Sequence, residues 1–148
     1  MGMRRFYITA VLLVAAFGLV ATATFAAMSP KESVGEQWRV AVEHSKLAQK
    51  ADGMKGVQQH LQHIMNCLEG RGGGMFDASQ GNPCEGKGNG MMVDAKSAGE
   101  KKYTAAMTWM ELSGDVATVG MKAKTAAKAK AAAWARQMVL EQTGAVLR

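Results

Sequence analysis

Residues 70–93 are too rich in glycine to form a regular helix or strand, and this stretch constrains the fold more than any other feature of the chain. Its glycines are Gly70, Gly72, Gly73, Gly74, Gly81, Gly86, Gly88 and Gly90. Such a stretch buries too little apolar surface to offset the backbone entropy that its ordering costs. We therefore predict a Gly-rich loop over residues 70–93 that is either mobile or held by a tether.

The N-terminus has the pattern of an export signal. Two arginines precede an apolar run over residues 6–27, and Thr24 and Ala26 supply the small residues that signal peptidase accepts. We expect a signal peptide over residues 1–26 and, after its cleavage, one domain over residues 27–148 in the periplasm or outside the cell. The alternative is an uncleaved anchor, because the apolar run is also about long enough to cross a bilayer.

Cys67 and Cys84 are the only cysteines of the chain. In an exported protein two cysteines are expected to pair with each other. The resulting disulfide would tether the Gly-rich loop and stabilise the fold by about 3 kcal/mol. A thiol-redox role is disfavoured, because the chain lacks the Cys-x-x-Cys spacing that activates a thiolate.

Two helices joined by a short turn are expected before the Gly-rich loop. Ser29 and Glu32 form a capping box around Pro30, so the first helix should begin at Pro30 and end at the turn formed by Asp52 and Gly53. The second helix should follow directly. The expected core positions recur at steps of three and four residues: Val34, Trp38, Ala41, Ser45 and Ala48 in the first helix, and Met54, Val57, Leu61, Ile64 and Leu68 in the second.

The C-terminal third also has helical periodicity. A second capping box, from Ser97 to Glu100, predicts a helix with inner residues Tyr103, Ala106, Met107 and Met110. We expect a break at residues 113–115 and a last helix over residues 116–143 with Gly144 as its C-cap; the alternative is one uninterrupted helix over residues 97–143. The inner stripe of the last helix is expected to be Val116, Gly120, Ala123, Ala127, Ala131, Trp134 and Met138.

No stretch has the alternation typical of a strand. The chain is therefore predicted to be all-α, a small bundle of three to four helices with a disulfide-tethered Gly-rich loop.

One flank of the second helix carries side chains that could bind a metal. His60, His63 and Cys67 lie within about 60° of one another at 100° per residue. The disulfide would fold the loop over this flank and bring candidate side chains near the histidines: Met75, Asp77, Met91 and Met92. Because copper and haem iron both accept imidazole and thioether ligands, the candidate metal or haem site consists of His60, His63, Met91 and Met92. The alternative is structural: the histidines donate hydrogen bonds to carbonyls of the loop.

Other function classes are disfavoured. The net charge of +6 is mild, and Arg4 and Arg5 of the signal contribute two of these charges. The lysines of residues 122–130 spread around a helix instead of forming one stripe, so we expect no nucleic acid partner. The glycines lack the strand and helix context of a phosphate-binding loop. No nucleophile with a recognisable base and no paired carboxylates indicate an enzyme. His44 is assigned a structural role.

Two hypotheses remain. The first is an exported, non-enzymatic helical protein without a cofactor, which presents the disulfide-pinned Gly-rich loop as a binding or accessory surface for another exported or envelope protein. The alternative is a periplasmic protein that binds a copper-like metal ion or haem through His60 and His63 with loop methionines. Membrane contact is expected only if the N-terminal segment stays uncleaved.

Overall fold

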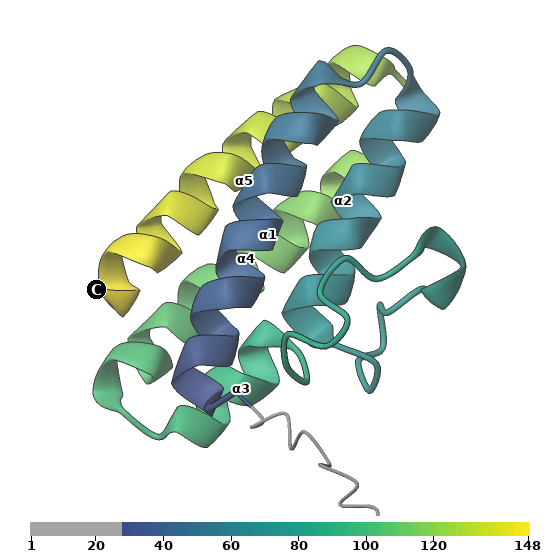
Figure 1. Ribbon diagram of the computed structural model, residues 1–148. Coiled ribbons are helices and arrows are strands. Elements are labelled where there is room, and N and C mark those ends of the chain that lie inside the picture. Colours follow the sequence, from purple (N-terminus) through teal and green to yellow (C-terminus); the bar gives the residue numbers. More distant parts are fainter. Residues whose placement is uncertain (1–27) are drawn as a thin grey trace, which may run out of the picture.

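The computed structural model describes residues 28–148, and this part of the chain is all-α, as predicted (Figure 1). The predicted signal peptide lies outside the described residues. There are five α-helices instead of three or four, and one short 3₁₀ turn: α1 (Pro30–Lys50), α2 (Met54–Glu69), η1 (Ala78–Gln80), α3 (Met91–Ala98), α4 (Lys101–Met121) and α5 (Ala126–Leu147). None of the described helices is both long enough and apolar enough to span a membrane.

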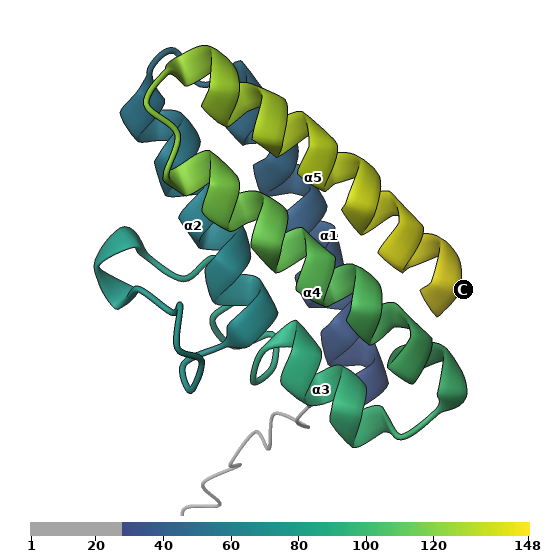
Figure 2. The ribbon, with the colours of Figure 1, turned by 180° about the vertical axis from the view of Figure 1, so that it is seen from behind.

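The four long helices lie side by side, and the short α3 lies at one end of them (Figures 1 and 2). α1 packs against α2 and α5, and α4 packs against α5 and α2. α3 contacts α1, α2 and α4, so it closes that end of the molecule. The segment between α2 and α3, residues 70–90, runs outside the long helices beside α2 (Figure 1).

The start of α1 is as predicted. The Ser29 hydroxyl accepts a hydrogen bond from the Glu32 backbone N–H, and the Glu32 carboxylate accepts one from the Ser29 N–H at 2.9 Å. These two bonds satisfy backbone donors that have no partner within the helix. Most of the core positions predicted for α1 and α2 are fully buried: Val34, Ala41, Ser45, Ala48, Val57, Leu61, Ile64 and Leu68. Trp38 and Met54 are half-buried.

α3 corrects the prediction that the loop extends to residue 93. The Asp94 carboxylate accepts hydrogen bonds from the Asn89 N–H at 3.0 Å and from Gln37 Nε2 at 2.7 Å, and Met91 is fully buried. These contacts fix the first turn of a helix that starts within the predicted loop. The predicted capping box at Ser97 is wrong, because Ser97 lies in the last turn of α3 and Glu100 precedes α4.

The predicted boundary between the last two helices is also wrong. α4 continues through residues 113–115, and the chain turns at residues 122–125, so the single-helix alternative fails as well. Thr125 caps α5 by accepting a hydrogen bond from the Lys128 N–H at 3.3 Å. Gly144 is not a C-cap but lies within α5, where a Cβ atom would come within 2.3 Å of Trp38 Cζ2.

The stripe predicted to face the core along α5 faces outward instead. Trp134 is 58% exposed and Met138 is 49% exposed, and Ala127 and Ala131 are exposed too. The buried face of α5 is formed by Ala129, Ala132, Ala133, Arg136, Leu140, Thr143 and Gly144. Because alanine lies on both faces of this helix, its apolar periodicity does not distinguish them.

Arg136 is the unexpected member of this core. Its side chain is fully buried, and among the described residues none of its three guanidinium nitrogens has a hydrogen-bond partner. Burial lowers its pKa to about 9, because desolvation penalises the charged form.

Candidate metal centre

Three histidines come together where α1 faces α2. His44 projects from α1, and His60 and His63 lie one turn apart on α2. The ring centroids are separated by 4.8, 5.2 and 5.6 Å, and all three side chains are half-buried. The antiparallel packing of the two helices therefore joins the two predicted histidines to His44, for which only a structural role was expected.

The Nδ1 atoms of the three rings converge. His44 Nδ1 lies 3.0 Å from His60 Nδ1 and 3.2 Å from His63 Nδ1, and the ligand atoms of the cluster all lie within 4.8 Å of one another. In a tetrahedral site with metal–nitrogen bonds of about 2.0–2.1 Å, adjacent nitrogens are about 3.3–3.4 Å apart. Two of the three separations are thus close to those of neighbouring ligands on one ion.

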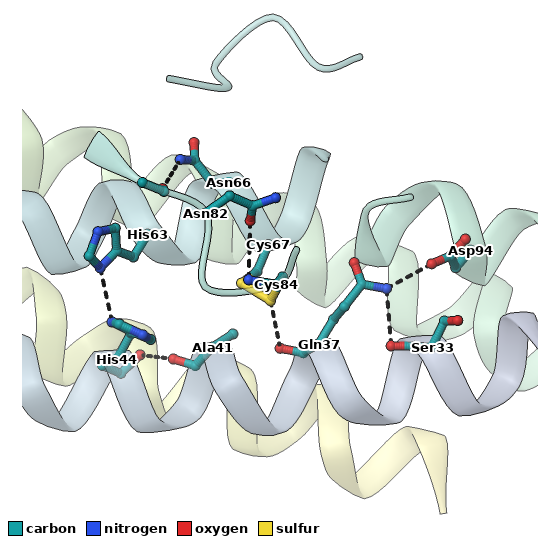
Figure 3. Close-up of a disulfide and its surroundings, with 12 residues drawn as sticks. Ser33, Gln37, Ala41, His44, His63, Asn66, Cys67, Asn82, Cys84 and Asp94 are labelled. Carbon is teal, nitrogen blue, oxygen red and sulfur yellow. Dashed lines mark hydrogen bonds between the residues drawn. A yellow bond between two sulfur atoms is a disulfide. The ribbon is translucent and has the colours of Figure 1, made fainter. Parts of the chain in front are cut away.

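A hydrogen bond fixes the proton of His63. Its Nε2 atom bonds the backbone carbonyl oxygen of Gln80. Since a carbonyl oxygen only accepts hydrogen bonds, the ring must carry its proton on Nε2. In the neutral ring, Nδ1 then has a free lone pair that points toward His44 (Figure 3).

Asn66 holds the segment that supplies this carbonyl group. Its side chain is fully buried one turn beyond His63 on α2. Nδ2 donates to the Asp77 carbonyl at 2.8 Å and to the Gly81 carbonyl at 2.6 Å, while Oδ1 accepts from the Asp77 N–H at 2.9 Å. One amide therefore anchors both ends of η1, and with them Gln80. Such outer partners orient the ligands of metal sites.

The predicted disulfide between Cys67 and Cys84 is present and ties the same segment to α2 (Figure 3). Cys67 follows His63 by one turn, and Cys84 follows Gln80 by four residues. Both half-cystines are buried, and Asn82 Oδ1 accepts a hydrogen bond from the Cys84 N–H at 3.1 Å. The bond is consistent with an oxidising, exported location.

The environment of His44 and His60 favours the neutral imidazole. Burial, followed by the neighbouring charges of His63 and His60, lowers the pKa of His44 to about 4. Burial, followed by the charge of His63, also lowers the pKa of His60. A neutral imidazole is the form that binds metal, so protons compete little with a cation at these two rings near pH 7.

The two methionines predicted as ligands lie on α3, which packs near the C-terminal end of α2 and away from the histidines. Met91 is fully buried in the first turn of α3, and Met92 follows it. The chain just before them packs on the end of α2, since a Cβ atom on Gly90 would lie 2.4 Å from the Glu69 carbonyl oxygen. Glu69 is six residues beyond His63, about 9 Å along the helix axis. The sulfur atoms therefore belong to a different level of the molecule from the histidines.

A cavity of about 580 Å³ lies between residues 70–90 and the adjoining ends of α2 and α3. Glycine backbone forms much of its wall, and none of the three histidines lines it. Its side-chain lining includes Gln37, Glu69, Arg71, Glu85, Asn89 and Met92. An ion pair between Arg71 and Glu85 joins two parts of the segment beside the cavity. This cavity is a second candidate site, separate from the histidine cluster.

Two residues of the histidine site were missed from the sequence, His44 as a candidate ligand and Asn66 as the anchor of η1. His44 precedes Asp52 by eight residues and His60 follows it by eight, so a helical hairpin that turns there brings both to one level. That signal was available. The role of Asn66 depends on the path of an irregular segment, which periodicity does not predict.

Comparison of the chain with protein-family models, with curated proteins and with solved structures finds no match.

Proposed function

We propose that the protein is an exported, non-enzymatic protein that binds a transition-metal ion through the Nδ1 atoms of His44, His60 and His63. The observation that carries this proposal is the convergence of those atoms, with separations of 3.0 and 3.2 Å from His44. The proposal keeps the two histidines expected from the sequence and replaces the methionines by His44.

The separations between the Nδ1 atoms favour a single ion bound by the protein alone over a haem iron. Two ligands on opposite faces of a haem iron are related through the metal and would lie about 4 Å apart at a metal–nitrogen length near 2.0 Å. The separations from His44 are shorter and fit ligands that are adjacent around one ion. A tetrahedral ion would have its fourth position open to solvent or to an incoming ligand.

The donor set narrows the choice of ion. Imidazole nitrogen suits zinc, copper and nickel, whereas calcium and magnesium prefer oxygen ligands. Among the described residues the cluster contains neither a carboxylate nor a free thiol. We expect Cu²⁺ to bind more tightly than Ni²⁺ or Zn²⁺, following the general order of divalent-ion affinities. Because all three imidazoles of the cluster would be ligands and no carboxylate stands beside them to act as a general base, the site suits holding or transferring an ion more than hydrolysis.

Binding should change the tautomer of His44. In the metal-free cluster, one proton between His44 Nδ1 and the facing Nδ1 atoms can form a hydrogen bond to only one or two lone pairs. A metal ion takes the place of that proton, and the His44 ring then carries its proton on Nε2. This exchange releases no net proton, so affinity should fall only when the pH drops far enough to protonate the neutral rings.

The proposal is tested by calorimetric titration of the exported, EDTA-treated protein with Cu²⁺, Ni²⁺ and Zn²⁺, together with elemental analysis. We expect one ion per chain. His44→Ala should weaken binding by about 100-fold or more, exceeding the roughly 10- to 100-fold that outer partners of ligands typically contribute. The chain has three histidines in all, so no other imidazole can substitute.

Met92→Leu is the matched control and should bind the ion as the unaltered protein does. A large loss in this variant would show that the methionine-containing site expected from the sequence is the correct one. Unchanged binding in His44→Ala, or no binding by the unaltered protein, would show that the histidine cluster is structural.

A second function is favoured by the cavity beside residues 70–90. Its glycine backbone and the polar ends of Arg71, Glu85 and Asn89 form a concave surface held by the disulfide. We propose this disulfide-pinned Gly-rich loop as the surface that meets another exported or envelope protein. The two functions are compatible, because the histidines lie on α1 and α2 and none of them lines the cavity beside the Gly-rich loop.

A further inference from the structure

The outer face of α5 is an apolar stripe that no other part of the described chain covers. Ala127, Ala131, Trp134, Met138 and Ala145 are all exposed and fall within about 60° of arc at 100° per residue. The stripe is opposite the buried face of the helix and extends about 27 Å along it. α5 lies at the edge of the molecule (Figures 1 and 2).

Large exposed side chains make this more than a run of small residues. Trp134 is 58% exposed and Met138 is 49% exposed, and both lie near the middle of the stripe. Exposed apolar surface of this kind marks interaction sites. The alanines on either side would let a second helix approach closely, to about 8–10 Å between axes.

We propose that this stripe is the interface of a homodimer, in which α5 packs antiparallel against α5 of a second copy. A twofold axis at the level of residue 136 would place Trp134 of each copy beside Met138 of the other. Ala127 would then face Ala145. Tryptophan against a thioether is a favourable contact, and the small residues at the two ends keep the helices close.

The charges beside the stripe support this partner. Lys130 and Glu141 lie on the same flank of the stripe, about 20° apart around the helix. In an antiparallel pair related by a twofold axis, like flanks face each other, so Lys130 of each copy meets Glu141 of the other. The pairing is reciprocal and forms two ion pairs from one chain sequence.

The same charges disfavour a membrane as the partner. Lys124 and Lys128 could attract an anionic bilayer at the start of α5, but Glu141 lies beside the other half of the stripe. A bilayer would repel that carboxylate, whereas a second copy pairs it with Lys130. A second copy can therefore cover the whole length of the stripe, whereas a bilayer would favour only its first half.

The test is sedimentation velocity of the exported full chain over a range of concentrations, with Trp134→Ala and two charge reversals. We expect the unaltered protein to sediment as a dimer and Trp134→Ala to sediment as a monomer at the same concentration. Lys130→Glu and Glu141→Lys should each raise the dissociation constant about tenfold. The double variant should restore it to within about twofold, because the pairs form again with their charges exchanged.

Val119→Ser is the matched control, since Val119 is 55% exposed on α4 outside the stripe, and it should leave the dimer intact. Circular dichroism would show that each variant is folded. A monomer at all concentrations, a dimer that persists in Trp134→Ala, or a double charge variant no tighter than the single ones would overturn the proposal. Flotation of a monomeric unaltered protein with anionic vesicles would assign the stripe to a membrane instead.

Discussion

The two helix pairs of this protein are packed in different ways. Where α1 meets α2, bulky apolar side chains such as Leu61 and Ile64 fill the core, and polar side chains on the flank make specific bonds to residues 70–90. Where α4 meets α5, the buried positions are mostly alanine and glycine, as at Ala117, Gly120 and Ala133. On α5 the large side chains are divided, because Trp134 and Met138 point away from the core whereas Arg136 and Leu140 are buried.

The two pairs therefore have different roles: the candidate sites lie on the α1–α2 pair, and the α4–α5 pair supports it. The α1–α2 pair carries the disulfide, the histidine cluster and the anchored segment, all of which depend on individual atoms. The α4–α5 pair depends on close backbone approach, which many small residues can provide but a single added methyl group can disturb. Substitutions should therefore act through specific bonds in the first pair and through volume in the second.

The largest expected effect is loss of the disulfide. A Cys67→Ala/Cys84→Ala variant should lose about 3 kcal/mol of unfolding free energy, measured by urea denaturation, because the bond restricts the unfolded chain. Residues 70–90 should also become sensitive to protease well before the helices unfold, since they pack through few apolar side chains. Mass spectrometry would locate the first cuts. Equal protease resistance would show that Asn66 and Asp94 hold the segment without the bond.

A matched pair of glycines tests the volume argument in α4. A Cβ atom on Gly120 would lie 2.5 Å from Leu61 Cδ1 and 2.9 Å from Ala132 Cβ, so Gly120→Ala should cost about 1–3 kcal/mol. On Gly114 the nearest atoms would be those of Met65 at 3.8 and 3.9 Å, which is ordinary contact. Gly114→Ala should therefore stabilise the helix by about 0.5–1 kcal/mol. Thermal unfolding would measure the change in stability of both variants. Equal changes would contradict the argument that volume limits substitutions in α4.

The same contrast explains what could be predicted from the sequence. In α1 and α2 large apolar residues recur on one face only, and the capping box at Ser29 marks the start, so the bounds and most of the core were predicted correctly. In α5 alanine occurs on both faces, so only Trp134 and Met138 indicated which face is buried. These two side chains are exposed, and the predicted face was therefore wrong. Nothing in the periodicity indicates that Arg136 replaces them in the core.

The histidine site was predicted in part for a related reason. Helical geometry predicts that His60 and His63 share a flank, and cysteine pairing predicts that the following segment folds back over it. The position of η1 depends on three hydrogen bonds of Asn66, and the position of Met91 depends on the buried Asp94 and Gln37. Such contacts between an irregular segment and a helix have no sequence period.

The last predicted effect is a dependence of stability on pH between pH 5 and pH 7, which should come from the α1–α2 pair. In the metal-free protein the pKa of His44 is about 4, against 6.5 for an unperturbed histidine, so between these values the unfolded chain binds more protons. The contribution to stability is complete above pH 6.5 and is lost as the pH falls toward 4. Urea denaturation with EDTA at pH 7 and pH 5 should differ by on the order of 1 kcal/mol, because solvent around the half-exposed ring reduces the full effect. His44→Gln should remove most of this difference, whereas Trp134→Ala on α5 should retain it. A slope that His44→Gln leaves unchanged would mean that other groups, and not the packed imidazoles, set the stability of this region between pH 5 and 7.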